Sequence, residues 1–236
     1  MKARSDPMDA PTAPPSAAPA VLAPARAARQ KAVADARREL VLAAAREAFI
    51  ELGLEGASLR EIAKRAGYSP GAIYSYFDSK EAVYGALLGE SLERLNAHVA
   101  AAEPAADHAA ERLRSKASAF FDFYREHPRD LDLGFYLFQG LQPRGLTPAL
   151  NEALNQRLRD ALAPAQAALQ ALGVDAALAQ TEVTALFAHS VGLLLLSHTG
   201  RIRMFGQQSQ ALFGRYLDDL LRRVAPVAIT PTESTP

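Results

Sequence analysis

The run SLREIAKRAGYSPGAIYSYFDSK, residues 58–80, constrains the fold of this chain more than any other segment. Ser58 followed three residues later by Glu61 is a capping box, which predicts that a helix begins at residue 59 with two free amides satisfied. Gly67 enters the left-handed backbone region without a Cβ penalty and therefore ends this helix at residue 66. The segment thus predicts a short first helix closed by a tight turn.

A second short helix is expected directly after that turn, over residues 70–76. Ser69 can cap its free amides, and Pro70 suits the first helical position, where no amide donor is needed. Ile73 and Phe77, four residues apart, fix the helix to the core. The small and polar residues between them face elsewhere, so this helix could lie in a DNA groove.

Helical periodicity continues through the rest of the chain, and we see no convincing alternating strand pattern. We therefore predict an all-α fold. Pro164 lies inside one expected helix and predicts a kink there. Besides the two short helices, the expected helices cover residues 30–52, 80–102, 107–126, 129–140, 148–172, 175–199 and 207–224.

Composition excludes several functional classes. The chain has no cysteine, which excludes disulfides, thiolate catalysis and cysteine zinc sites and fits a reducing cytoplasm. Lys plus Arg equals Asp plus Glu at 26 each, so no global charge points to nucleic acid. Residues 26–80 hold a small basic surplus, which supports DNA binding only weakly. The longest apolar run, residues 185–196, is shorter than the about 20 residues needed to span a bilayer, so no membrane anchor is expected.

The segment from about Arg38 to Leu87, and above all IAKRAGYSPGAIYSYFDSKEAVY, resembles the DNA-binding domain of TetR-family transcriptional regulators. The capped helix, glycine turn, small second helix, aromatic pair and Lys-Glu helix start share the family's spacing. The resemblance implies a three-helix helix-turn-helix domain at residues 29–78 and a C-terminal helical ligand-binding and dimerisation domain at 79–224. Residues 1–28 and 225–236 are expected to be flexible tails.

A major-groove site is expected on the second short helix and its flanks, because a recognition helix enters the groove while the preceding helix crosses the backbone. Tyrosine and serine hydroxyls suit phosphates or bases, and the resemblance implies a phosphate contact for Tyr74. Lys80, at a helix start, is a candidate phosphate ligand. As alternatives, Tyr74 is a packing aromatic and Lys80 a solvated charge. The candidate DNA-binding residues are Ser58, Arg60, Tyr68, Ser69, Gly71, Ala72, Tyr74, Ser75, Tyr76 and Lys80.

Helix 175–199 is apolar on nearly its whole circumference, which requires cover on two sides. One cover is its own domain; the other is most simply a second copy of the chain. Pairing helices 175–199 and 207–224 with their symmetry mates would give a four-helix bundle, which the resemblance also implies. The alternative is a core helix of a monomer.

The resemblance further implies a small, largely apolar effector bound in the C-terminal domain. Aromatic residues concentrate on two neighbouring helices, although ordinary core packing explains such clusters equally simply. His189 is a polar candidate in an apolar helix, with a buried structural role as the alternative. The candidate ligand-binding residues are Phe120, Phe123, Tyr124, Phe135, Phe138 and His189. His189 and His198 lie out of phase on their helix, so no metal site is expected, and no cofactor.

The leading hypothesis is a cytoplasmic homodimeric repressor that binds a palindromic operator and is released from it by a small effector. An enzyme is not expected, since we find no phosphate-binding loop, paired-histidine motif or catalytic triad spacing. A regulator without a small-molecule ligand, constitutive or controlled by a protein partner, remains the alternative. Whether the N-terminal tail contacts DNA, and whether the protein represses or activates, stay open at this stage.

Overall fold

The structure is a computed structural model that describes residues 22–135 and 146–224. Within these ranges every regular element is a helix, which confirms the all-α prediction. The elements are α1 (Leu22–Gly56), α2 (Leu59–Ala66), α3 (Pro70–Ile73), α4 (Lys80–Ala101), α5 (Ala109–Glu126), α6 (Pro128–Phe135), α7 (Pro148–Ala171), α8 (Ala176–His198), the 3-10 helix η1 (Arg201–Phe205) and α9 (Ser209–Val224).

The first helix begins earlier than the sequence analysis predicted. α1 starts at Leu22, so residues 22–28, assigned above to a tail, are helical. Alanine and arginine are among the best helix formers, and Pro24 is tolerated because the first turn needs no amide donors. At the other end, Gly53 leaves the helical region with a φ of 69°, at the residue where the helix was expected to stop.

Two further helices differ from expectation. α3 ends at Ile73, not at residue 76, and Tyr74 to Tyr76 form a turn closed by amide donation from Phe77 to the Ile73 carbonyl. α7 continues through Pro164 as one helix. The described part of α6 ends at Phe135, so the rest of the helix expected at 129–140 lies outside the described residues, as do residues 1–21 and 225–236.

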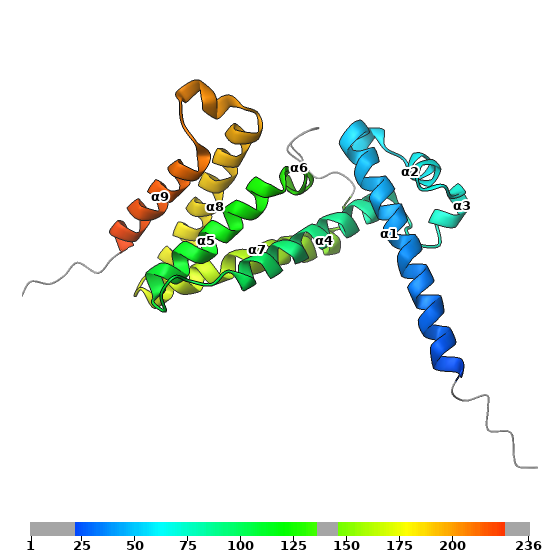
Figure 1. Ribbon diagram of the computed structural model, residues 1–236, viewed down its shortest axis with the longest axis horizontal. Coiled ribbons are helices and arrows are strands. Elements are labelled where there is room, and N and C mark those ends of the chain that lie inside the picture. Colours follow the sequence, from blue (N-terminus) through cyan, green and yellow to red (C-terminus); the bar gives the residue numbers. More distant parts are fainter. Residues whose placement is uncertain (1–21, 136–145, 225–236) are drawn as a thin grey trace, which may run out of the picture.

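The helices form two groups joined by α4. α1, α2 and α3 pack together at one end of the molecule, and α4 runs from them into the second group, where it lies against α7 and α5 (Figure 1). α8 and α9 form a hairpin that packs on α5 and α7 from the far side. Buried apolar residues form one continuous core through both groups.

Two glycines let α4 and α7 approach closely. A Cβ on Gly85 would lie 2.5 Å from Cδ2 of Leu150, and one on Gly89 would lie 2.4 Å from Nη1 of Arg157. About two turns further along α4, the Asn96 side chain donates to the Arg157 carbonyl oxygen at 2.9 Å. α4, which leads directly out of the helix-turn-helix, is thereby fixed against α7.

Side-chain contacts also tie the first group of helices to α4 and α6. Arg38 of α1 donates to Glu90 of α4 at 3.1 Å, and its guanidinium lies 5.4 Å from the centre of the Phe77 ring. Tyr84 of α4 packs edge-on against Phe49 of α1 and donates its hydroxyl hydrogen to the Leu133 carbonyl of α6. A displacement of α6 would therefore move Tyr84 and with it the start of α4.

Candidate DNA-binding surface and ligand cavity

The helix-turn-helix has the local geometry that its sequence predicts, with one exception. Gly67 adopts a left-handed φ of 73°, and the Ser58 hydroxyl accepts from the Glu61 amide at 3.2 Å. The reciprocal half of the capping box is replaced, because the Glu61 carboxylate accepts from Nε of Arg65 at 2.9 Å. Arginine four residues on offers this carboxylate a charged donor, which is stronger than a neutral amide.

The second helix is held by its own serines. The Ser69 hydroxyl accepts from the Ala72 amide at 3.3 Å, as expected for an N-cap, and the Ser75 hydroxyl donates to the Ala72 carbonyl at 2.7 Å. Both hydroxyls keep lone pairs that can accept from a base. The Ser75 proton, in contrast, is engaged within the protein.

The residues proposed to contact DNA lie together at one end of the molecule and are accessible. Tyr74, directly after α3, is 58% exposed, while its neighbour Ile73 is fully buried. This alternation gives α3 an inner and an outer face. Ser58, Arg60, Ser69, Gly71 and Ser75 are also exposed, and Tyr68, Ala72, Tyr76 and Lys80 are partly buried.

Lys80 has a structural role that the sequence analysis did not foresee. Its ammonium donates to the Leu54 carbonyl at 2.9 Å and to the Glu55 carbonyl at 3.2 Å. These carbonyls belong to the last turn of α1, where no backbone donor follows. Lys80 therefore holds α1 to the start of α4, and it has one further hydrogen available for an outside acceptor.

Besides Lys31, which pairs with Asp35, two basic residues counted in this domain form ion pairs with other described residues. Arg65 lies 2.6 Å from Glu51 and 2.9 Å from Glu61, and hydrogen bonds to these carboxylates raise the pKa of its guanidinium. Arg38 pairs with Glu90. A tally of charges along the sequence cannot show this neutralisation, because Glu51 and Glu90 are distant from their partners in the chain.

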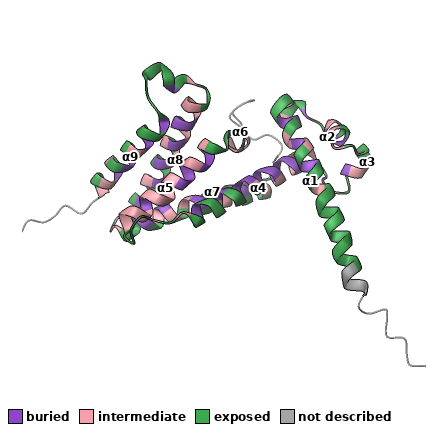
Figure 2. Cartoon of the chain, viewed as in Figure 1, coloured by how far each residue is buried: buried purple, intermediate pink, exposed green. Residues whose placement is uncertain are grey.

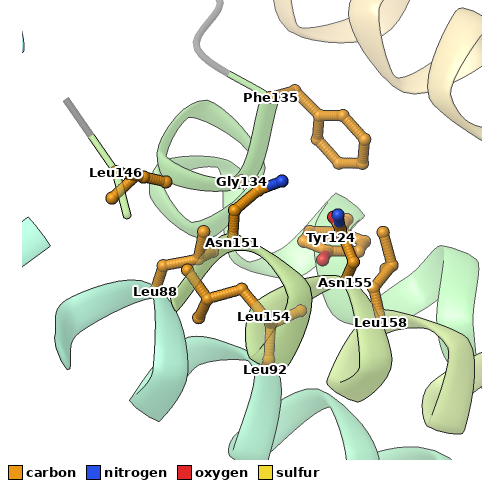
Figure 3. Close-up of a pocket in the computed structure, with 10 residues that line it drawn as sticks. All are labelled: Leu88, Leu92, Tyr124, Gly134, Phe135, Leu146, Asn151, Leu154, Asn155 and Leu158. Carbon is orange, nitrogen blue, oxygen red and sulfur yellow. The ribbon is translucent and has the colours of Figure 1, made fainter. Parts of the chain in front are cut away.

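A cavity of about 100 Å³ lies between α4, α6 and α7, with Tyr124 of α5 at its wall (Figure 3). Its walls are mainly leucine, and Asn151 and Asn155, one turn apart on α7, supply polar groups. Burial raises the pKa of the Tyr124 phenol, so its hydroxyl stays protonated and can donate. The lining residues are Leu88, Leu92, Tyr124, Gly134, Phe135, Leu146, Asn151, Leu154, Asn155 and Leu158.

Of the ligand-binding residues proposed from the sequence, Tyr124 and Phe135 line this cavity. Phe120 and Phe123 are almost fully buried and pack edge-on against the Tyr124 ring, with centroids 5.4 and 5.3 Å away. They belong to the aromatic core behind the cavity, which was the alternative interpretation. Phe138 lies outside the described residues.

His189 lies away from this cavity, between α8 and α9. Its ring stacks on that of Tyr216 with centroids 4.2 Å apart, and burial lowers its pKa. Its Nε2 atom and the Tyr216 hydroxyl are both buried with no hydrogen-bond partner within the protomer. The structure therefore does not bring His189 together with the other proposed ligand residues.

The cavity residues that sequence reasoning missed are aliphatic or amide side chains. The ligand-binding residues were predicted from aromatic clusters, whereas this cavity is lined chiefly by Leu88, Leu92, Leu154 and Leu158. One available signal was the pair Asn151 and Asn155, which places two amides on one face of a helix that is otherwise rich in leucine and alanine.

Two further observations concern partners. α8 is long and apolar enough to span a membrane by length and composition alone, and 33% of its most apolar window is buried. The prediction of no membrane anchor rested on the apolar run at residues 185–196, which is shorter than this helix. Among the side chains of the described ranges, no group of three or more His, Cys, Asp or Glu is placed to hold a metal ion.

Comparison with known proteins identifies the N-terminal helices. Residues 41–87, from α1 into α4, match the family model for bacterial regulatory proteins of the tetR family. The helix-turn-helix of this chain is a TetR-family domain. Its curated relatives include the transcriptional activator FasR of Mycolicibacterium smegmatis, 39% identical over 38% of this chain and 41% of FasR. The transcriptional repressor BepR of Brucella suis is 40% identical over 27% of this chain and 30% of BepR.

Solved TetR-family structures share the fold over most of the chain. A regulatory protein of this family from Rhodococcus RHA1 superposes with a TM-score of 0.62 at 21% identity, covering 81% of this chain and 98% of that one. The regulator FadR of Bacillus subtilis, in complex with stearoyl-CoA, gives 0.54 at 21% identity and covers 76% and 95%. The shared fold therefore extends beyond the matched domain. In sequence, the chain spans less than half the length of the two curated relatives named above.

Proposed function

We propose that this TetR-family protein is a cytoplasmic homodimeric transcriptional regulator that binds a palindromic operator through α2 and α3. The observation that carries the proposal is the exposed Tyr74, which directly follows a short helix whose Ile73 is buried and which comes after the Gly67 turn. A recognition helix needs an inner face that fixes it and an outer face without bulk. Gly71 and the partly buried Ala72 provide that outer face, and Arg60 of α2 is exposed in the same domain.

The dimer is supported by the outer face of α8. Its buried residues, such as Val183 and Leu186, face the protomer, while Ala185, Ala188 and Gly192 are exposed on the opposite side. Small side chains let two helices approach closely, and the partly buried Leu212 and Tyr216 of α9 extend the surface. A partner copy could also supply acceptors or donors for His189 and Tyr216, which lack them within the protomer.

The effector is proposed to bind in the cavity between α4, α6 and α7, with apolar groups against the leucines and a polar group at Asn151 and Asn155. α4 forms one wall and also begins at the helix-turn-helix. A ligand that binds the two arrangements of α4 unequally would shift the population away from the spacing that fits DNA. We propose release from DNA, hence repression, as the outcome.

The volume of this cavity supports a second candidate function, a regulator without a small-molecule ligand. Drug-sized ligands occupy about 300–1,000 Å³, whereas this cavity measures about 100 Å³. A small cavity favours a regulator that is constitutive or controlled by a protein partner. Binding of a drug-sized ligand would require α4 and α7 to separate, against the Gly85 and Gly89 contacts.

The test begins with duplexes enriched from a random pool by the full chain. Wild-type protein should bind an enriched, two-fold symmetric duplex, and Tyr74→Ala should weaken binding without changing the folded fraction. The control is Arg159→Gln, at an exposed position of α7 outside the helix-turn-helix, which should bind the duplex like wild type. Absence of any enriched duplex would overturn DNA binding.

The two candidate functions are separated by adding small apolar carboxylates, amides and acyl esters to the bound complex. Release that is abolished by Leu154→Phe, which fills the cavity, would support the effector. Binding that no member of the set disturbs, together with unchanged affinity of Leu154→Phe for DNA, would support the constitutive regulator.

A further inference from the structure

The N-terminal half of α1 is a free helix. Every residue from Arg26 to Arg37 is exposed, and Figure 2 shows this part of the helix exposed throughout. In Figure 1 it projects past α2 and α3, with no other described element beside it. A helix that packs on nothing gains no stability from a core. Its surface chemistry therefore decides what it can contact.

The charges of this free helix are separated onto two sides. At 3.6 residues per turn, Arg26 and Arg37 are about three turns apart and nearly aligned, with Arg29 beside them. None of the three forms an ion pair with a described residue. Lys31 and Asp35 lie on the other side and pair with each other at 2.9 Å. The first side is therefore purely basic.

This basic side continues the face of α1 that meets the helix-turn-helix. Glu51, which is paired with Arg65 of α2, lies 14 residues or about four turns beyond Arg37 and so points the same way. A duplex that receives α3 in its major groove continues to either side of that helix. The basic side of α1 extends from the same domain toward this flanking DNA.

We propose that Arg26, Arg29 and Arg37 bind phosphates of the duplex outside the half-site contacted by α2 and α3. Residues 26 to 37 cover about 16 Å of helix axis, a length over which duplex DNA carries roughly ten phosphate charges. Arginine donors suit phosphate oxygens, and Ala27, Ala34 and Val33 are too small to hold the helix away from the backbone. The contact is independent of base sequence and adds affinity.

A second copy of the chain fits this face less well. Its large apolar side chains, Val33 and Leu40, are 47% and 55% exposed but stand apart, seven residues from each other. Three unpaired arginines on each copy would repel one another across such a contact. DNA is therefore the occupant that the charge pattern favours. The inference rests on the proposed DNA binding.

The test uses the full chain and an enriched duplex, prepared with flanks of about ten base pairs, one helical turn, and without flanks. The variant replaces all three arginines: Arg26→Gln, Arg29→Gln and Arg37→Gln. Glutamine keeps helix propensity and removes charge. The matched control removes three exposed arginines far from this domain: Arg159→Gln, Arg201→Gln and Arg222→Gln. Affinity is measured by fluorescence anisotropy between about 50 and 200 mM salt.

With the flanked duplex, the variant should bind at least about tenfold more weakly near 0.15 M salt, with a salt slope smaller by about 2.7 per protomer, or about 0.9 per lost contact. The control should match wild type, and the variant's deficit should vanish without flanks. Equal slopes for variant and wild type on the flanked duplex would overturn the inference. A variant that changes only the oligomeric state would point to a second copy and overturn it as well.

Failure of the proposed function has a different signature. If no duplex is enriched, or if Tyr74→Ala binds as well as wild type, the helix-turn-helix does not read DNA. If Tyr74→Ala loses affinity while the triple-arginine variant does not, DNA binding stands and only the contribution of α1 is excluded.

Discussion

Lys80 shows how one side chain can serve the fold and the proposed DNA site together. Its ammonium closes the end of α1 by donating to the Leu54 and Glu55 carbonyls, and it also lies at the start of α4 beside the exposed turn. A charge that is fixed by two backbone acceptors loses little freedom on meeting a phosphate. The same residue type at a helix start was expected from the sequence, but its two carbonyl partners, 25 and 26 residues away, were not.

Replacing Lys80 by glutamine should lower the free energy of unfolding by about 1–2 kcal/mol, because hydrogen bonds to charged groups contribute about that much or more. Denaturant unfolding followed by circular dichroism measures the loss. Lys64→Gln, which removes an exposed lysine on α2, should leave stability within about 0.5 kcal/mol of wild type. Equal stabilities for the two variants would show that the carbonyl contacts of Lys80 contribute nothing.

His189 predicts a pH dependence of stability. Burial lowers its pKa in the folded protein from the ordinary value of 6.5, so the unfolded chain binds a proton more readily. The contribution of this histidine to stability is therefore complete above pH 6.5 and decreases as the pH falls below it toward the folded pKa. Glu182 and Arg223, which pair at 2.9 Å, are the charged groups that face Tyr216.

The comparison is between wild type and His189→Phe, which retains a ring against Tyr216. Thermal unfolding should show a loss of stability between about pH 7 and 5.5 that is smaller in His189→Phe. His108→Asn is the control, since it removes a histidine but keeps an acceptor for the Glu111 amide at the start of α5. A pH profile of His189→Phe that superposes on wild type would contradict the assignment.

At the scale of elements, the sequence predicted those helices whose ends carry a specific residue. Ser58, Gly67 and Ser69 each cap a helix where expected, because capping is a local interaction between neighbours in the chain. The start of α1 was missed, since proline and alanine together were taken for a tail. The end of α3 was also missed, because a turn at Tyr74 to Tyr76 differs from a helix only by weak local preferences.

The two glycines of the helix-turn-helix give opposite predictions. Gly67 has a φ of 73°, so Gly67→Ala should destabilise the protein by about 1–2 kcal/mol. Gly71 has open space around its Cβ position and no left-handed φ. Gly71→Ala should therefore keep or slightly raise stability while weakening DNA binding by about tenfold, because the backbone can no longer approach the groove as closely.

Thermal unfolding and duplex binding on the same two preparations separate these effects. Gly67→Asn serves as the control for the turn, since asparagine tolerates the left-handed region better than alanine and should recover part of the stability. If Gly71→Ala binds DNA like wild type, the α3 backbone does not lie against the duplex, and readout would have to come from Tyr74 and Arg60.

At the scale of the whole molecule, packing between segments distant in the chain determines where the cavity lies, which the sequence did not predict. The cavity lies between α4 and α7, next to the close approach of these helices at Gly85 and Gly89. No local sequence pattern shows which leucines line such a gap. The outer surface of α8 was easier to anticipate, because a helix that is apolar all round requires a second cover whatever its neighbours. What covers it determines the assembly.

Ala188 is exposed at the middle of that surface, so Ala188→Arg should separate a dimer into monomers. A buried, unpaired guanidinium costs several kcal/mol, more than a small helical contact can offset. Each monomer could then engage only one half-site, and affinity for a two-fold symmetric duplex should fall by about 100-fold or more, as linked binding events become independent.

Sedimentation equilibrium measures the assembly and fluorescence anisotropy the affinity. Ala153→Arg, at an exposed position of α7, is the control and should remain a dimer. An Ala188→Arg protein that sediments as a dimer would place the interface elsewhere, whereas wild-type monomers that partition into phospholipid vesicles would make the membrane the cover of α8.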